Sequence, residues 1–396
     1  MISNNLFKTK FENFHNKSNN NQNVAQFIHA SDIHLGSHQY RNEHRSEDFI
    51  RAFQEILELA IKYYVDFIIL GGDVFTSLEM LPGTLTKIID ILRDFKDFTN
   101  GSILIIAIEG NHDIRKFSRG IRFEKRDQSW LKLLNNLGLI ILLNADLEAP
   151  IGEIFIPYNF ETKRGGKIQI KNIVIYGTHY LGEKPISFLS IIRRAIVKNC
   201  ALYNILLQHF GIEGQMENVP GIKLKDIQPL RHRVNYLALG HFHKQFILEN
   251  WIYNPGSSEA VCSMDNSFKR GIFLVKISKK DDFFTKQVKI IQLANRKYLW
   301  QTIYINFEIR DKYKIEDFII NKLKSSLKYL SHDFHPSNRQ MPILYLILKG
   351  IEPSKTCKIN EKDLRVKICE ILPILDVIIY QKFMSSLKTL DNYILV

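Results

Sequence analysis

The chain has few cysteines, no long apolar run and no secretion signal. Its four cysteines, Cys200, Cys262, Cys357 and Cys369, include no CxxC pair, which argues against a disulfide framework and against a structural zinc site. The longest apolar runs, such as residues 103–108, are far shorter than the roughly 18 residues needed to cross a bilayer. No basic start is followed by an apolar segment. We therefore expect a cytoplasmic or nucleoid-associated protein that is not secreted and has no membrane partner.

Basic side chains are in excess. The 396 residues include 54 Lys and Arg against 41 Asp and Glu, a formal net charge of +13. Such a balance favours a nucleic acid or another polyanion as the partner. Hydrophobic residues make up 45% of the chain and charged residues 24%, which is typical of a globular protein. The length predicts one large domain and one smaller domain.

The composition changes along the chain. Residues 1–24 are rich in Asn and have little apolar periodicity, which predicts a disordered leader. In residues 25–290, short apolar runs alternate with segments of helical period, a pattern typical of α/β folds. One helix is expected from Ser46, as its N-cap, to about Tyr64. Strands buried on both faces are expected at residues 27–30, 66–70, 103–108, 173–176, 204–207 and 236–239.

A smaller α/β domain is predicted for residues 296–380, followed by a short C-terminal tail, residues 381–396. Residues 296–396 hold 17 basic and 11 acidic side chains, an excess of +6, against 37 and 30, an excess of +7, in the first 295 residues. The greater charge per residue is consistent with a nucleic-acid-binding surface or with solvated lysines. The expected strands are 302–307, 344–349 and 375–380, and the expected helices are 314–330 and 362–372.

Residues that can bind metal follow five of the predicted strands. Asp32 and His34 come after the first strand, and Asp73 comes after the second. Because ligand sites in open α/β sheets form at the carboxyl ends of the strands, we expect these side chains to lie at one edge. The full candidate set is Asp32, His34, Asp73, Asn111, His209, His241 and His243.

The candidate set contains carboxylates, imidazoles and one amide, but no thiolate. This inventory favours Mn²⁺, Fe²⁺ or catalytic Zn²⁺ over a structural zinc or a Ca²⁺ cage. Seven ligands exceed what one ion can use with a position left open, so we expect two ions about 3.5–4 Å apart. Each motif alone also occurs in ordinary loops. It is their common placement at strand ends that indicates a metal site.

The order of the motifs, D-x-H, GGD, GNHD, H and GHxH, resembles that of the calcineurin-type metallophosphoesterase superfamily. Within it, the segments SDIHLGSHQYRNEHRSEDFIRAFQEI, NYLALGHFHK and YNPGSSE are similar to the double-strand-break repair nucleases, which are bacterial SbcD and its archaeal and eukaryotic counterparts. The similarity is strong from Phe27 to about Ile277 and looser beyond. It implies an α/β fold in which a metallophosphoesterase β-sandwich flanked by helices, residues 25–290, precedes a DNA-binding cap domain, residues 296–380.

The resemblance also implies a role for each candidate residue. Manganese is the family's usual metal, and two Mn²⁺ ions are expected, with Mg²⁺, Fe²⁺ or Zn²⁺ as alternatives. His112 would protonate the leaving oxygen or stabilise the charge on phosphorus, and Asp113 would either orient His112 or serve only as a turn cap. One ion would be held by Asp32, His34 and His243, the other by Asn111, His209 and His241, with Asp73 as the bridge.

The function implied is that of a Mn-dependent DNA nuclease, an exonuclease, an endonuclease or both, which processes DNA ends. An SMC-like coiled-coil ATPase and a second copy of the chain are the implied protein partners.

Two features of the sequence depart from the pattern of the family. Thr76 stands where archaeal and eukaryotic members commonly have a histidine, and only a short segment follows Tyr380, where the family often has a helix that grips the ATPase.

Two rival functions are a two-metal phosphoesterase that acts on small phosphodiesters or phosphoproteins, and a non-catalytic DNA-binding scaffold. The net charge disfavours the first, and the complete ligand set disfavours the second.

The segment 115–127 carries six basic and two acidic side chains and would either hold DNA phosphates or be a solvated loop. His179 is expected to be structural rather than a further ligand. The candidate phosphate-binding residues are Arg115, Lys116, Arg119 and Arg122.

Overall fold

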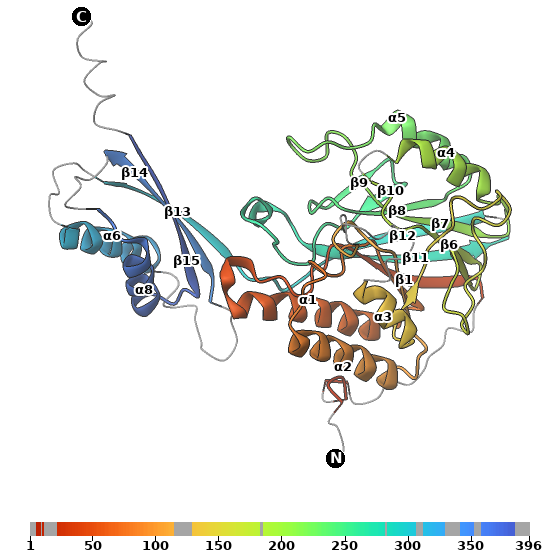
Figure 1. The fold of residues 1–396 in the computed structure, drawn as a ribbon, viewed down its shortest axis with the longest axis horizontal. Coiled ribbons are helices and arrows are strands. Elements are labelled where there is room, and N and C mark those ends of the chain that lie inside the picture. The colour runs from red at the N-terminus through yellow and green to blue at the C-terminus, as the bar shows by residue number, and fades with distance from the viewer. Residues whose placement is uncertain are drawn as a thin grey trace, which may run out of the picture. The chain divides into compact units, whose positions relative to one another are not determined.

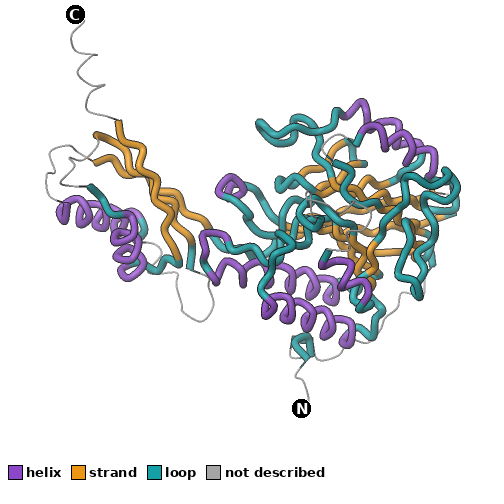
Figure 2. Tube along the Cα trace, in the orientation of Figure 1, coloured by secondary structure: helices purple, strands orange, loops and turns teal. Residues whose placement is uncertain are grey.

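We describe the protein from a computed structural model, which forms two compact units, Met1–Asn295 and Arg296–Val396. Figures 1 and 2 show the helices and strands of each unit. The structure describes residues 5–8, 10–11, 22–114, 129–182, 185–281, 283–305, 312–328, 341–351 and 358–384.

Two six-stranded sheets form the centre of the first unit. The first sheet has the order β12-β11-β1-β2-β3-β4, in which β1 to β4 are parallel and β11 runs antiparallel to β1. The second has the order β5-β6-β7-β8-β10-β9. The strands of the first sheet are β1 (Val24–Ala30), β2 (Phe67–Leu70), β3 (Leu104–Ala107), β4 (Ile141–Leu142), β11 (Gly271–Lys280) and β12 (Phe283–Gln292). Those of the second are β5 (Lys167–Ile170), β6 (Ile173–Gly177), β7 (Tyr203–His209), β8 (Tyr236–Gly240), β9 (Phe246–Leu248) and β10 (Ile252–Asn254).

Helices cover the outer face of each sheet. One apolar cluster joins the first sheet to its helices, a second lies between the two sheets, and a third joins the second sheet to its helices. The first unit is therefore a β-sandwich flanked by helices, as the sequence motifs predict. The helices are α1 (Glu43–Lys62), α2 (Pro82–Phe98), α3 (Trp130–Asn136), α4 (Ile186–Ala195) and α5 (Leu224–Ile227).

The side-chain alternation of a strand explains the unbroken apolar runs. In β2, Phe67 and Ile69 face the cluster between the sheets, while Ile68 and Leu70 face the helical cluster. All four side chains of this strand are buried. The six strands predicted in residues 25–290 correspond to β1, β2, β3, β6, β7 and β8.

The predicted start of the first helix is wrong. The N-cap of α1 is Asn42, whose side chain accepts a hydrogen bond from the backbone N–H of His44. Ser46 lies inside the helix and is buried. An amide oxygen caps as well as a hydroxyl does, so the composition alone did not discriminate between the two positions.

The predicted disordered leader also needs correction where the structure describes it. Phe7 is fully buried in the helical cluster of the first sheet, and its ring lies 5.7 Å from Phe95 and 6.3 Å from Phe98. The Asn5 amide donates to the carbonyl of Asp94. The buried Phe7 ring, together with contacts of Asn5, Leu6 and Phe11, attaches this segment to α2.

In the part of the second unit that the structure describes, a three-stranded parallel sheet packs against two helices. The strands are β13 (Tyr298–Ile305), β14 (Ile343–Ile351) and β15 (Asp376–Met384), in the order β13-β14-β15, and the helices are α6 (Lys312–Ser326) and α8 (Glu361–Ile371). Both helices pack on the same face of the sheet, where one apolar cluster joins them to the strands (Figure 1). Because β15 continues to Met384, the first residues of the predicted tail belong to the sheet. None of the helices that the structure describes is long and apolar enough to pass through a membrane.

Candidate metal centre

The candidate metal ligands follow the carboxyl ends of strands from both sheets of the sandwich. β1, β2 and β3 of the first sheet lead to Asp32 and His34, to Asp73 and to Asn111, respectively. His209 is the last residue of β7, and His241 and His243 follow β8. Parallel strands end at the same edge of a sheet, which brings residues that are separated by about half of the chain to one place.

The backbone at this edge is left-handed at four of the seven candidates. The φ angles are 51° at Asp32, 51° at His34, 49° at Asp73 and 89° at His241. Non-glycine residues adopt this conformation rarely, and clusters of it are typical of functional sites. At both Asp32 and His34 the left-handed backbone breaks the side-chain alternation of an extended strand. Tight turns after β1 aim each of them separately.

Two groups of ligand atoms converge at this edge. Asp32, His34 and His243 form the first group, in which the candidate ligand atoms lie within 4.8 Å of one another. The Nε2 atoms of His34 and His243 face each other at 3.2 Å. Both carboxylate oxygens of Asp32 accept the backbone N–H of His241 at 3.1 Å, which holds the two sheets together at the site.

Asp73, His209 and His241 form the second group, again with ligand atoms within 4.8 Å of one another. The amide oxygen of Asn111 lies 3.0 Å from Nε2 of His209 and 3.0 Å from Nδ1 of His241. The Nδ1 atom of His209 donates to the carbonyl of Gly71 at 2.7 Å, which directs its Nε2 into the cluster. The structure thus brings all seven predicted ligands together, and His241 and His243 belong to different groups.

Asp73 is tightly enclosed. Its Oδ1 accepts the backbone N–H of His112 at 2.7 Å, and its Oδ2 lies 3.2 Å from Nε2 of His209. A Cβ atom on Gly110 would lie 2.2 Å from Oδ1 of Asp73, so only glycine fits before Asn111. This contact explains the glycine of the GNHD motif by close approach rather than by an unusual backbone angle.

Burial sets the protonation of the imidazoles. It lowers the pKa of His34 to about 3 and the pKa of His241 to about 3, so both rings are neutral at neutral pH. For His209, the carboxylate of Asp73 outweighs burial and raises the pKa to about 9. Burial also acts on Asp73, but the nearby His209 holds its pKa below the usual range. A divalent cation would take the place of the proton shared by this pair.

The donor set suits divalent metal ions. Each group combines carboxylate oxygen with imidazole nitrogen, and the side chains of Asp32, His34, Asp73 and His209 are buried. Buried carboxylates and neutral imidazoles that face one another are costly without a cation between them. The arrangement fits two ions at neighbouring positions.

His112 lies next to the two groups but belongs to neither. Its ring centre is 5.0 Å from that of His34, and its side chain is exposed. The Nδ1 atom lies 2.9 Å from the backbone carbonyl of Thr76, which acts as the acceptor. Position 76 therefore contributes its main chain to His112, and this contact does not depend on a histidine side chain there.

Asp113 does not orient His112. Its carboxylate accepts backbone N–H groups of Val74, Phe75 and Gly110 at 2.9–3.2 Å. These bonds join the loop that carries Asp73 to the loop that carries Asn111. Asp113 caps its own turn through Gly110 and, beyond that role, holds the two ligand loops together through Val74 and Phe75.

Two residues that lie near the ligands were not predicted from the sequence. Asp265 lies 2.8 Å from Nδ1 of His243, and the ring of Tyr180 lies 5.9 Å from that of His209. Neither belongs to a motif, and Asp265 sits in a 3-10 helix (Ser263–Ser267) that follows the YNPGSSE segment. His179 lies outside both groups and contacts Asn144, as expected for a structural residue. Arg115, Lys116, Arg119 and Arg122 lie outside the described residues.

The chain is similar to known proteins over most of its length. The model of the calcineurin-like phosphoesterases matches residues 25–245. The DNA double-strand break repair protein Mre11 of Saccharolobus solfataricus is 26% identical over 385 residues, which cover 93% of this chain and 85% of that protein. Mre11 of Sulfurisphaera tokodaii is 26% identical over 342 residues, covering 85% of this chain and 76% of that protein. Mre11 of Archaeoglobus fulgidus is 28% identical over 242 residues, covering 59% of this chain and 50% of that protein.

The family model covers more than half of the chain and includes every strand that leads to the candidate ligands. It confirms the superfamily that the motifs D-x-H, GGD, GNHD, H and GHxH predict, together with the sandwich fold. The protein belongs to the calcineurin-like phosphoesterase family and is a metal-dependent enzyme that hydrolyses phosphate esters.

Proposed function

We propose that this enzyme is a two-metal DNA nuclease that processes DNA ends in double-strand-break repair. The observation that carries the proposal is the extent of the similarity to Mre11. The alignment with the Saccharolobus solfataricus protein covers 385 residues, and the first unit ends at Asn295, so the similarity continues well into the second unit. The net charge of +13 also favours a polyanionic substrate.

The proposed roles follow the two groups of ligands. Asp32, His34 and His243 would hold one ion, and Asn111, His209 and His241 would hold the other, with Asp73 available to both. Manganese is the proposed metal, since imidazole and carboxylate ligands together suit Mn²⁺. When bound, two divalent ions supply a water activated for attack and neutralise charge on the phosphate.

His112 is the proposed acid for the leaving oxygen. The carbonyl of Thr76 accepts a hydrogen bond from Nδ1 of His112 and so keeps a proton on that atom. Proton transfer to the leaving oxygen therefore uses Nε2 of His112, whose exposed side chain can reach a bound phosphodiester. The backbone N–H of His112 is bound to Asp73, which fixes the ring beside the ions. Asp113 keeps the two loops in register through its three backbone bonds.

The second unit, residues 296–380 and the continuation of β15, is proposed to contact DNA. Arg115, Lys116, Arg119 and Arg122 are proposed to hold backbone phosphates near the site. A coiled-coil ATPase and a second copy of the chain are the proposed protein partners, as for the repair nucleases that the sequence resembles.

The test compares substrates under one set of conditions. The purified full chain, loaded with Mn²⁺, is given linear duplex DNA, single-stranded circles and a small chromogenic phosphodiester, and an EDTA-treated sample is the control. We expect cleavage of DNA that disappears with EDTA. Hydrolysis of the small ester without cleavage of any DNA would support a phosphoesterase for small substrates. DNA binding without metal uptake in equilibrium dialysis would support a scaffold role.

A further inference from the structure

The sheet of the second unit has one face covered by helices and one face made of aromatic and basic side chains. Alternate residues of a strand point to opposite faces. Ile303, Leu346 and Val377 belong to the apolar cluster with α6 and α8, so their neighbours in each strand lie on the other face. We call this other face the aromatic face. Its members are Tyr298, Trp300, Thr302 and Tyr304 of β13, Ile343, Tyr345, Ile347 and Lys349 of β14, and Ile378, Tyr380 and Lys382 of β15.

The rings of the aromatic face are stacked across the strands. Trp300 is paired with Tyr345 in the ladder, and their rings are 4.4 Å apart and inclined by only 13°. The rings of Tyr345 and Tyr380 are also inclined by 13°, at 6.2 Å. Tyr345 is fully buried, whereas Trp300 is 49% exposed. Because β13 is an edge strand of this sheet, the Trp300 ring is the last ring of the stacked row.

Tyr304 extends the face along the same strand and is 67% exposed. The Nζ atom of Lys349 lies 6.0 Å from the centre of its ring. Trp300 and Tyr304 are four residues apart in the strand, about 13 Å, so that each ring can accept a separate base.

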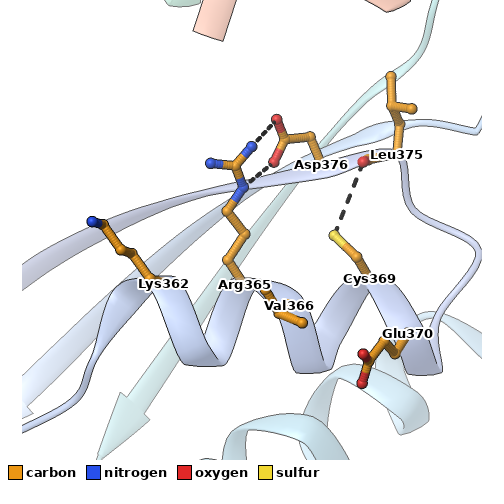
Figure 3. Close-up of a pocket in the computed structure, with 7 residues that line it drawn as sticks. All are labelled: Lys362, Arg365, Val366, Cys369, Glu370, Leu375 and Asp376. Atoms are coloured by element: carbon orange, nitrogen blue, oxygen red, sulfur yellow. Dashed lines mark hydrogen bonds and ion pairs between the residues drawn. The ribbon is translucent and has the colours of Figure 1, made fainter. Parts of the chain in front are cut away.

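The charge of the aromatic face is positive where the face is open. Lys349 and Lys382 are direct neighbours in the ladder, and neither has an ion-pair partner among the residues that the structure describes. Two like charges side by side in a sheet destabilise it, and an anion between them relieves the repulsion. At the other end of β15, the carboxylate of Asp376 is bound by both Nε and Nη2 of Arg365 on α8, at 2.5 and 2.7 Å (Figure 3). It therefore does not neutralise the lysines.

We propose that the aromatic face is a binding site for single-stranded nucleic acid, with bases stacked on Trp300 and Tyr304 and phosphates beside Lys349 and Lys382. Exposed rings combined with unpaired lysines match a ligand that has flat bases and a charged backbone. A duplex hides the faces of its bases in its own stack, so the site selects unpaired strands. The proposal deepens the proposed nuclease function, because it names the form of DNA that the second unit takes.

The experiment measures binding without cleavage. The full chain is treated with EDTA, and its affinity for a labelled dT oligonucleotide of about 16 nucleotides is compared with that for a duplex of the same length. We expect Trp300→Ala and Tyr304→Ala each to weaken dT binding by about 5- to 150-fold, the range found for loss of one stacked base, and to change duplex binding by less than about twofold. Tyr304→Phe, which keeps the ring, should bind dT as the wild type does.

Val366→Ala is the matched control, because Val366 is 55% exposed on α8, the helix that packs on the opposite face of the sheet. It should leave dT binding unchanged. If Trp300→Ala does not fold, Trp300→Phe gives a second readout. Binding of dT should quench tryptophan fluorescence in the wild type, and this quenching should be lost in Trp300→Phe, although two other tryptophans remain.

Unchanged dT affinity in both alanine variants would overturn the proposal, and so would equal losses for dT and duplex. Conversion of a dimer to a monomer by Trp300→Ala would also overturn it, since the face would then be a contact between copies. Parallel cleavage assays with Mn²⁺ separate this proposal from the nuclease function. If the wild type cleaves DNA but Trp300→Ala binds dT as tightly as the wild type does, only the aromatic site is refuted. If dT binding depends on Trp300 but no sample cleaves DNA, only the proposed nuclease function is refuted.

Discussion

The carboxylate of Asp265 lies 2.8 Å from Nδ1 of His243, on the side of the ring opposite the metal ligands. Burial of His243 is outweighed by this hydrogen bond and the neighbouring carboxylates, which raise its pKa. The same carboxylate accepts the backbone N–H groups of Val261 and Cys262, so its position is fixed by its own loop. Contacts of this kind orient a histidine ligand and increase its basicity.

Asp265→Asn should therefore weaken the binding of one metal ion by about 10- to 100-fold, because the neutral amide no longer supports the His243 ring. Isothermal titration with Mn²⁺ measures the change. Asp97→Asn, at an exposed position of α2, is the control and should bind both ions normally. An unchanged affinity in Asp265→Asn would show that His243 is oriented without Asp265.

His112→Gln and His241→Ala should separate chemistry from metal binding. His112 is not one of the convergent ligands, so His112→Gln should retain both ions while losing about 10²- to 10⁴-fold in phosphodiester cleavage. His241→Ala removes a ligand and should lose one ion. Metal content by atomic absorption and cleavage of DNA are measured on the same samples. Wild-type activity in His112→Gln would remove the role of His112 as the acid.

Thr76→Ala should leave cleavage within about threefold of the wild type, because the contact to His112 comes from the backbone carbonyl of residue 76. Initial rates at saturating Mn²⁺ test this expectation. A loss of tenfold or more, about 1.4 kcal/mol, would mean that the hydroxyl itself takes part.

His29 should make the protein sensitive to mild acid. It is fully buried between the hydroxyl of Tyr236 and the carbonyl of Leu239, and burial lowers its pKa to about 3. A depressed pKa stabilises the fold above the unfolded value of 6.5, and this stability is lost as the pH falls towards 3. Between pH 6.5 and 5 the loss is about 2 kcal/mol.

His29→Gln keeps an amide donor for the carbonyl of Leu239 but does not titrate. Its free energy of unfolding in urea should therefore fall less than that of the wild type between pH 6.5 and 5. Identical pH dependence of the two proteins would show that other groups account for the acid sensitivity.

Arg45→Ala should destabilise the first unit by about 3–5 kcal/mol. The Arg45 side chain is fully buried and binds Asp48 at 2.5 Å and Glu259 at 3.3 Å, so its removal leaves the buried Glu259 without a cation and Asp48 with Arg51 alone. Urea denaturation measures the loss. Arg51→Ala is the control, because Arg51 also binds Asp48 but its side chain is 38% exposed, and it should cost less than about 1 kcal/mol. Equal costs for the two variants would contradict a special role for Arg45.

The fold class, six of the sandwich strands and the residue types of the metal site could be predicted from the sequence. This was possible because strands buried on both faces have continuous apolar runs, as in β2 and β7, and because the ligands directly follow such runs. The start of α1 and the attachment of Phe7 were not foreseen, since Asn42 and Ser46 are both good N-caps and one aromatic residue gives no periodic signal.

Tertiary structure alone decided how the site is assembled. The family resemblance already implied that His241 and His243 hold different ions, but the left-handed backbone at His241 was not predicted. The support of His243 by Asp265, the carbonyl of Thr76 beside His112 and the row of rings on Trp300, Tyr345 and Tyr380 likewise join separate segments. Such contacts depend on how turns fold back and on the register between strands, and these follow from the packing of the whole unit rather than from local pattern.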